Sequence, residues 1–308
     1  MEQSIITSRQ RKSWTKDRLF SLINGTLLLI ILIIVAYPMY FTIIASLSDP
    51  LETARGTVIF FPKGFTLEAY KEVFRESQVW VGYGNTIYYT VLGTIVNLIC
   101  TIPTAYALSH KKLPLRRTAT WFFMFTMYFS GGIIPSYLVI KNMNLLDTRT
   151  VLIVCSAVQV YFLVTARNYY DTSIPEEIYE AAHIDGASEL KTFWQIALPL
   201  SAPIISLMIL YYAVMHWNNY INAFMYITDT DKYPLQLVLR KILLMSSNMG
   251  QIAGTLDDDL MAAYARKALM AETMKYSLIF IASFPVMIAY VFVQKRFMTG
   301  LTAGAVKG

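Results

Sequence analysis

Charged residues are scarce in this sequence, and long stretches of it contain none. Asp, Glu, Lys and Arg together make up 15% of the 308 residues, whereas hydrophobic residues make up 56%. The mean hydropathy is +0.46, which is rarely seen in a water-soluble globular protein of this length. The composition therefore excludes an ordinary soluble domain and predicts an integral membrane protein.

Motifs of catalytic and metal-binding sites are missing as well. The two cysteines, Cys100 and Cys155, both fall in apolar runs, where a disulfide would be unusual. The three histidines, His110, His183 and His216, are far apart and have no Cys or carboxylate neighbours at metal-ligand spacing. The sequence has no glycine-rich phosphate loop, nucleophile elbow or GxGxxG motif. We therefore expect no catalytic centre, no metal and no cofactor in this chain.

Six long runs without Asp, Glu, Lys or Arg predict six transmembrane helices, because about 20 apolar residues are needed to cross about 30 Å of hydrocarbon. Five of the runs contain a proline, which membrane helices tolerate as a kink. The expected fold class is an all-α membrane protein with kinked helices around a cavity. The six spans are expected at about residues 20–47, 85–108, 118–140, 150–166, 199–220 and 277–293.

The Lys and Arg residues next to the spans predict their orientation. Basic residues are concentrated in the tail 1–19 and in the short connection between the second and third spans. The positive-inside rule places both in the cytoplasm, together with residues 167–196 and the tail 295–308. The long loops 48–84 and 221–276 then face outward. The net charge of +6 is explained by this topology, so we expect no nucleic-acid partner.

The spans also lack the charges that ion-coupled carriers use. Such carriers place Asp, Glu, Lys or Arg inside the membrane to bind the coupling ion or to relay protons. Here the predicted spans contain no Asp, Glu, Lys or Arg, and His216, near the outer end of the fifth span, is their only titratable residue of this kind. A transporter built this way is expected to take its energy from a partner.

A polar, helix-forming insert at residues 174–197 separates the fourth and fifth spans. Ser173, Pro175 and Glu176 are spaced as in a capping box, with Ser173 as N-cap and Glu176 reaching back to its amide. Gly186 permits a sharp change of direction, and Ser188 is expected to cap a second helix. Such a hairpin of helices suits insertion into a cleft of a partner, and the alternative is a solvated connector.

At this spacing, Glu180-Ala-Ala, Asp185-Gly-Ala and Ile196-x-Leu-Pro resemble the "EAA" coupling motif of permease subunits of bacterial ATP-binding-cassette (ABC) importers. Residues 61–70 and the ending 300–308 are similar to signatures of the carbohydrate branch, the maltose-permease-like type I importers. Residues 130–137 and 144–148 resemble a subgroup that handles complex-polysaccharide fragments. The resemblance covers essentially the whole chain and implies the type I ABC importer permease fold.

The resemblance also implies partners and site residues. The partners would be a second homologous permease, an ATPase dimer that binds ATP and Mg, an extracellular sugar-binding protein and an oligosaccharide, at the bacterial cytoplasmic membrane with both termini inside. The chain itself would hydrolyse nothing. Phe193 and Ile196 would pack the second helix onto the transmembrane core. The residues implied in ATPase coupling are Glu180, Ala181, Ala182, Asp185, Gly186, Ala187, Phe193, Ile196 and Pro199, and those of an ATPase-contacting tail are Gly300, Gly304, Lys307 and Gly308.

The end of the fifth span is the candidate for sugar contact, since pyranose rings bind flat aromatic faces and paired amide or hydroxyl groups. The alternative is an ordinary aromatic belt at the membrane surface. Also open are a permease for another solute, an ion-coupled secondary carrier and a non-transporting sensor. The candidate sugar residues are His216, Trp217, Asn218, Asn219 and Tyr220, with Tyr128 and Tyr137 as weaker candidates in the third span.

Overall fold

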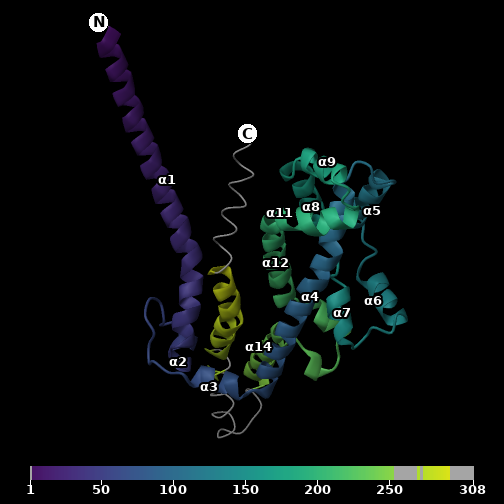
Figure 1. Ribbon diagram of the computed structural model, residues 1–308. Helices are drawn as coiled ribbons and strands as arrows, with labels where there is room; N and C mark the ends of the chain where they lie inside the picture. Colours follow the sequence, from purple (N-terminus) through teal and green to yellow (C-terminus); the bar gives the residue numbers. More distant parts are fainter. Residues whose placement is uncertain (1, 253–268, 271–272, 292–308) are drawn as a thin grey trace. The chain divides into compact units, whose positions relative to one another are not determined.

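The computed structural model describes residues 2–252, 269–270 and 273–291, which form helices joined by short connections (Figure 1). Within these residues, the contacts divide the chain into two units. The first lies within residues 1–73 and 246–280, and the second within residues 74–245 and 281–308. The second unit contains the predicted coupling insert, so it positions the candidate site.

The first unit is dominated by one long helix, α1 (Glu2–Ser46), whose segment Asp17–Ser46 is long and apolar enough to cross a membrane. A short helix follows, α2 (Pro50–Ala54), capped by the carboxylate of Asp49, which accepts from the amide of Leu51 at 2.8 Å. The loop after α2 is tied back to the end of α1, because the amide of Thr66 donates to the carbonyl of Leu47. This brings the loop to α3 (Glu68–Arg75).

The second unit is organised around α4 (Ser77–Ser109), a 33-residue helix that is almost free of charge. Helices α7, α8 and α12 pack against α4 (Figure 1). The helices that follow α4 are α5 (Arg116–Tyr128), α6 (Ile133–Asn142), α7 (Arg149–Val154), α8 (Val160–Ser173), α9 (Glu176–Ile184), α10 (Glu189–Thr192), a π-helix (Phe193–Ala197), α11 (Leu198–Leu200), α12 (Ala202–Trp217), α13 (Ile221–Tyr226), a 3-10 helix (Thr230–Lys232), α14 (Leu235–Ile252) and the helix Thr273–Val291.

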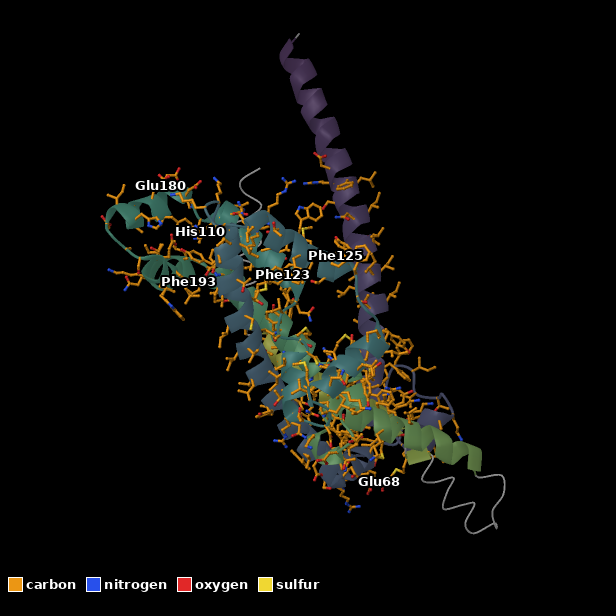
Figure 2. All side chains as sticks on the ribbon, turned by 90° about the vertical axis from the view of Figure 1, so that its right-hand side faces the viewer. Glu68, His110, Phe123, Phe125, Glu180 and Phe193 are labelled. Carbon is orange, nitrogen blue, oxygen red and sulfur yellow. The ribbon has the colours of Figure 1, made fainter. Side chains whose placement is uncertain are left out.

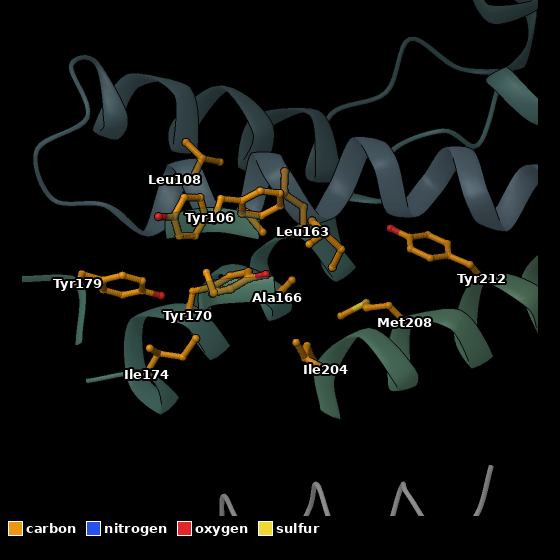
Figure 3. Close-up of a cluster of buried hydrophobic side chains, with 14 residues drawn as sticks. Tyr106, Leu108, Leu163, Ala166, Tyr170, Ile174, Tyr179, Ile204, Met208 and Tyr212 are labelled. Carbon is orange, nitrogen blue, oxygen red and sulfur yellow. The ribbon is translucent and has the colours of Figure 1, made fainter. Parts of the chain in front are cut away.

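The core of the second unit is a cluster of buried side chains where α4, α8 and α12 meet (Figure 3). Each of these helices turns a row of apolar residues inward at helical spacing. Two hydroxyl pairs cross this core: Thr101 bonds Tyr212 at 2.7 Å, and Tyr170 donates to Ser201 at 2.9 Å. Polar groups buried between helices are stable only when they are paired in this way. The members of the cluster include Ile102, Ala105, Tyr106, Leu163, Ala166, Tyr170, Ile204, Met208 and Tyr212.

Five of the six predicted spans correspond to helices or bent pairs of helices. The first, second and sixth match the continuous segments Asp17–Ser46, Ser77–Ser109 and Thr273–Val291. The third and fifth match bent pairs: α5 and α6 meet at 115°, and the segment Glu189–Leu200 meets α12 at 76°. By length and composition, the described residues thus provide three spanning helices, or up to five if each bent pair counts as one.

The prolines act differently from one span to the next. Pro38 and Pro103 lie inside the continuous helices α1 and α4. Pro135 and Pro203 instead lie in the first turn of α6 and α12, directly after a break. The first turn is the position where the missing proline N–H costs nothing. The sequence predicts a kink at each proline. In the third and fifth spans the structure instead has a break in the helix just before the proline.

The segment 150–166, predicted as the fourth span, is not one continuous helix. Helix α7 ends at Val154 and α8 begins at Val160, and residues 155–159 between them are not helical. Neither proline nor glycine occurs in this gap. The physical reason lies in α4, where the side-chain amide of Asn97 donates to the carbonyls of Ser156 and Ala157. A tertiary contact thus replaces the intrahelical hydrogen bonds.

Candidate functional site

The hairpin formed by α9 and α10 turns where the sequence predicts it. The amide of Ala187 donates to the carbonyl of Ala182 at 2.9 Å, and the amide of Gly186 donates to that of His183 at 3.0 Å. This pair of bonds is the Schellman motif, which satisfies the last carbonyls of a helix. It requires a left-handed residue after the C-cap Asp185, and Gly186 has a φ of +75°. The Asp-Gly-Ala sequence is therefore a helix stop that reverses the chain.

The beginning of α9 differs from the predicted capping box. Ser173 is the last residue of α8, the N-cap of α9 is Pro175, and Pro175 makes no side-chain capping bond. Glu176 instead pairs with Lys111, with 2.6 Å between Oε2 and Nζ. Helix α8 extends further than expected because Tyr170 and Ile174 are buried in the core of the unit. The capping box was a local pattern that this packing overrode.

The second helix of the hairpin begins as predicted and continues differently. The hydroxyl of Ser188 caps α10 by accepting from the amide of Lys191 at 3.4 Å. After α10 the chain passes into a π-helix, closed by a bond from the Leu198 amide to the carbonyl of Phe193. Pro199 lies inside α11, and the bend into α12 comes at Ser201, where Tyr170 donates to the hydroxyl. Pro199 therefore does not end the helix, and the break follows two residues after it.

The inner face of the hairpin is held by aromatic rings. Phe193 is buried, with its ring centroid 5.0 Å from that of Tyr106 in α4. Tyr179 of α9 is buried as well and packs edge-on against His110 at 5.2 Å and Tyr106 at 6.1 Å. Ile196 is half-buried and lies outside this cluster. The hairpin is thus fixed to the core mainly through Phe193 and Tyr179.

The outer face of the hairpin carries the polar residues of the predicted motif and, in addition, exposed apolar ones. Glu180, Ala181, Asp185 and Gly186 are exposed, Ala187 is half-buried and Ala182 is buried. Exposed large apolar side chains surround them, and the motif did not identify these. They are Ile184 at 86%, Leu190 at 73% and Trp194 at 62% exposure. Apolar side chains at solvent positions of a short polar helix are the signal that could have found them.

A cavity of about 380 Å³ lies between α9 and the connection at 106–114. Figure 2 shows His110 and Glu180 at the same end of the second unit, with Phe193 beside them. Burial lowers the pKa of His110, and burial likewise raises the pKa of Tyr179. The two helices of the hairpin also meet through side chains, because His183 Nε2 lies 3.3 Å from Glu189 Oε1. The carboxylate of Glu180 at the rim makes no hydrogen bond or ion pair within the described chain.

Residues 79–298 match the protein family described as binding-protein-dependent transport system inner membrane component. The match includes α4, the broken fourth span and the whole hairpin.

The chain belongs to this family.

Relatives and a solved structure agree with the assignment. The permease is 39% identical over 271 residues to Protein LplC of Bacillus subtilis (strain 168), covering 88% of this chain and 89% of that protein. It is 35% identical over 293 residues to the polygalacturonan/rhamnogalacturonan transport system permease protein YtcP of the same strain, covering 95% and 100%. A chain in the crystal structure of a bacterial ABC transporter involved in the import of the acidic polysaccharide alginate has 32% identity and a TM-score of 0.80, covering 92% and 98%. The expected type I ABC importer permease fold is confirmed.

The structure does not bring the predicted sugar residues together on one surface. His216 is buried, with Nε2 2.6 Å from Oδ1 of Asn97, and Trp217 is buried and donates from Nε1 to the carbonyl of Ala282 at 3.0 Å. Asn218 is exposed, and its amide bonds the carbonyl of Val214 within its own helix. The side chains of His216 and Trp217 therefore serve the packing of this permease unit.

The remaining sugar candidates lie apart from that pair. Asn219 is half-buried, and Tyr220 is partly exposed with the Arg240 guanidinium 5.3 Å from its ring centroid. Tyr128 is exposed at the end of α5, and Tyr137 stacks on Tyr226 with 6.3 Å between centroids. These four residues stay predictions. The predicted tail residues Gly300, Gly304, Lys307 and Gly308 lie outside the described residues.

No group of three or more metal-binding side chains occurs in the described part of the permease.

Proposed function

We propose that this permease is the membrane-spanning subunit through which ATP hydrolysis in a separate ATPase drives the import of polysaccharide-derived oligosaccharides. In this proposal it pairs with a second, homologous permease and receives sugar from an extracellular binding protein. Residues 1–19 and the carboxy-terminal tail are cytoplasmic, as the positive-inside rule predicts. The outer surface of the α9–α10 hairpin is the observation that carries the proposal.

The hairpin has the chemistry of a docking surface. Three large apolar side chains, Ile184, Leu190 and Trp194, are exposed on it. An exposed apolar group of this kind gains free energy when a partner covers it. Glu180 is exposed on the same hairpin, and its carboxylate makes no hydrogen bond or ion pair with another described residue, so it offers a charge to a basic partner residue. This mixture of an apolar anchor and a charge suits a groove on a soluble protein.

The hairpin is also attached to the membrane helices in a way that transmits displacement. Phe193 packs on Tyr106 of α4, so a push on the second helix reaches the centre of the unit. The bond between Tyr170 and Ser201 joins α8, which enters the hairpin, to the bend that leaves it. Close-packed elements of this kind move together rather than deform. Closure of an ATPase dimer around the hairpin would thereby shift α8 and α12.

Coupling is tested in the assembled importer reconstituted with its ATPase and binding protein. We expect Glu180→Ala to abolish most of the sugar-stimulated ATP hydrolysis and uptake while leaving the complex assembled. The matched control is Glu177→Ala, since Glu177 is exposed in the first turn of the same helix. Equal activity of the Glu180→Ala and wild-type complexes would show that this carboxylate has no part in coupling.

The proposed substrate class rests on what the relatives are named for. YtcP is named for polygalacturonan and rhamnogalacturonan transport, and the alginate transporter imports an acidic polysaccharide. We therefore expect uronic-acid oligosaccharides as the cargo of this permease. Uptake of labelled oligogalacturonates and of neutral oligosaccharides of equal length by the reconstituted importer tests this expectation. If only the neutral oligosaccharides were taken up, the proposed acidic substrate class would be wrong, and the proposal of sugar import would remain.

A further inference from the structure

The gap in the fourth span leaves backbone carbonyls without helical partners. Helix α7 ends at Val154 and α8 begins at Val160. Inside a bilayer such groups must find partners in the protein or line a water-filled space. Two of them are satisfied by one side chain, because Nδ2 of Asn97 donates to the carbonyls of Ser156 and Ala157, the latter at 2.9 Å. Asn97 is fully buried in the middle of α4.

The hydrogen-bond count of this amide fixes its orientation. Nδ2 has two hydrogens, and both are used on the two carbonyls, so the Oδ1 atom must face a donor. That donor is His216 of α12, with Nε2 2.6 Å from Oδ1. Because an amide oxygen only accepts, Nε2 of His216 carries a hydrogen in this arrangement. If the amide were flipped, its NH₂ group would face His216 and its oxygen would face two carbonyls.

The space for this contact is provided by a glycine one helical turn before Asn97. A Cβ atom built on Gly93 would collide with the imidazole of His216. Residues four apart lie on the same face of a helix, so Gly93 and Asn97 present one site to the histidine. By contrast, a Cβ built on Gly84 of the same helix meets no atom within 4 Å. The close approach therefore requires glycine at 93 and tolerates other residues at 84.

We propose that Asn97, oriented by His216, is a positioning residue that holds the fourth span open at residues 155–159. The segment itself contains neither Pro nor Gly to break a helix, so the buried amide is what stabilises the gap. Helix α8 runs from this gap to Ser173, and only two residues separate it from α9. The gap thus lies at the amino-terminal end of α8, and the coupling hairpin follows its carboxy-terminal end. An effect of Asn97 on transport rests on the proposed function, whereas its effect on the gap at 155–159 does not.

Hydrogen–deuterium exchange of the assembled importer tests the gap directly. Asn97→Leu leaves the carbonyls of Ser156 and Ala157 without their donor and so destabilises the gap. We therefore expect the amides of residues 155–160 to exchange about tenfold faster, because the segment opens more often. His216→Leu should have a similar effect, because the amide loses the donor that orients it. His216→Gln should restore slow exchange, since its amide N–H can donate to Oδ1. Equal exchange in the Leu and Gln variants would overturn the role given to His216.

A second set of variants keeps the test decisive if Asn97→Leu fails to assemble. Gly93→Ala displaces the imidazole without altering either polar side chain, so we expect faster exchange at 155–160, whereas Gly84→Ala should behave as wild type. Unchanged exchange in Gly93→Ala would refute the proposal. Sugar uptake per ATP hydrolysed, measured in the same complexes, should fall in Gly93→Ala and stay unchanged in Gly84→Ala. If the proposed function itself is wrong, the wild-type complex will show no ATP-dependent sugar uptake, whatever the exchange data give.

Discussion

The carboxylate of Asp147 accepts hydrogen bonds from the backbone amides of Thr228 and Asp229, at 3.1 and 3.0 Å. The ammonium group of Lys232 donates to the backbone carbonyl of Asp147 at 2.8 Å, and the amide of Asp147 donates to the carbonyl of Tyr226. The connection after α6 is thereby joined to the segment after α13. This junction gives a structural role to Asp147 in the sequence 144–148, which by resemblance indicates only a subgroup.

Asp147 is also in the left-handed backbone region, with a φ of +57°. Asp and Asn tolerate this region better than other residues with a Cβ. We therefore expect Asp147→Ala to loosen the junction, because it removes the acceptor and retains the strain, and to lower the melting temperature of the complex by about 2–4 °C. Asp147→Asn, which keeps an acceptor oxygen, should be milder. Thermal unfolding of both variants checks this, and a larger effect from Asn than from Ala would contradict it.

The same junction predicts an acid limit. The backbone amide of Asp229, followed by that of Thr228 and the charge of Lys232, lowers the pKa of Asp147, and the amide of Asp231 lowers the pKa of Asp229. A carboxyl group with a lowered pKa in the folded state stabilises that state above its unfolded pKa, and the stabilisation is lost as the pH falls through the folded value. Protease cleavage within residues 227–233 should thus be constant from pH 7 to about 5 and increase only below about 4. In Asp147→Ala most of this pH dependence should disappear.

The turn of the hairpin offers a test of backbone geometry alone. Gly186 has a φ of +75°, and a Cβ added there meets no atom within 4 Å. Gly186→Ala should therefore lower the free energy of unfolding by about 1–2 kcal/mol. The cause is the left-handed backbone conformation and not a steric overlap. We expect reduced sugar-stimulated ATP hydrolysis in Gly186→Ala and a smaller reduction in Gly186→Asn, since Asn accepts the left-handed region more readily. Equal loss in both variants would indicate that the site excludes any side chain at 186.

Substitutions of the adjacent aromatic residues Phe193 and Trp194 should have different effects, one on the stability of the permease and the other on partner binding. Phe193 is buried, whereas Trp194 is 62% exposed. Phe193→Ala should destabilise the permease by about 3–5 kcal/mol, as expected when a buried aromatic ring is removed. Trp194→Ala should leave thermal stability unchanged and weaken association with the ATPase, measured by co-purification at increasing dilution. A stable complex with Trp194→Ala at every dilution would remove this residue from the docking surface.

The features that follow from local chemistry could be predicted from the sequence. Long uncharged runs such as 85–108 are helices because an apolar run in a bilayer has no other way to satisfy its backbone. Gly186 reverses the chain because glycine adopts the left-handed region without strain, and Ser188 caps α10 through a hydrogen bond to a residue only three positions later. In each case the residue that specifies the feature lies inside it.

The features that depend on partners far away in the sequence could not be predicted from the sequence. The gap at 155–159 is stabilised by Asn97, 59 residues before Ser156 in the sequence. The capping box at Ser173 fits the local pattern, yet α8 continues through Ser173 because Tyr170 is buried against α12. The aromatic and polar neighbours of His216 predict a sugar contact, whereas its contact with Asn97, 119 residues away in the sequence, has no local signal.

The π-helix at Phe193–Ala197 absorbs one residue of chain length ahead of the fifth span. Each π-turn encloses one residue more than an α-turn, whereas one extra residue in an unbroken α-helix corresponds to a rotation of about 100° about the helix axis. Because the wider turn takes up that residue, deleting a single residue here would let the segment form ordinary α-helix, and the side chains that follow it would keep about the same face. The connection between the hairpin and the fifth span can therefore change in length by one residue without turning the residues after it to another side of the helix.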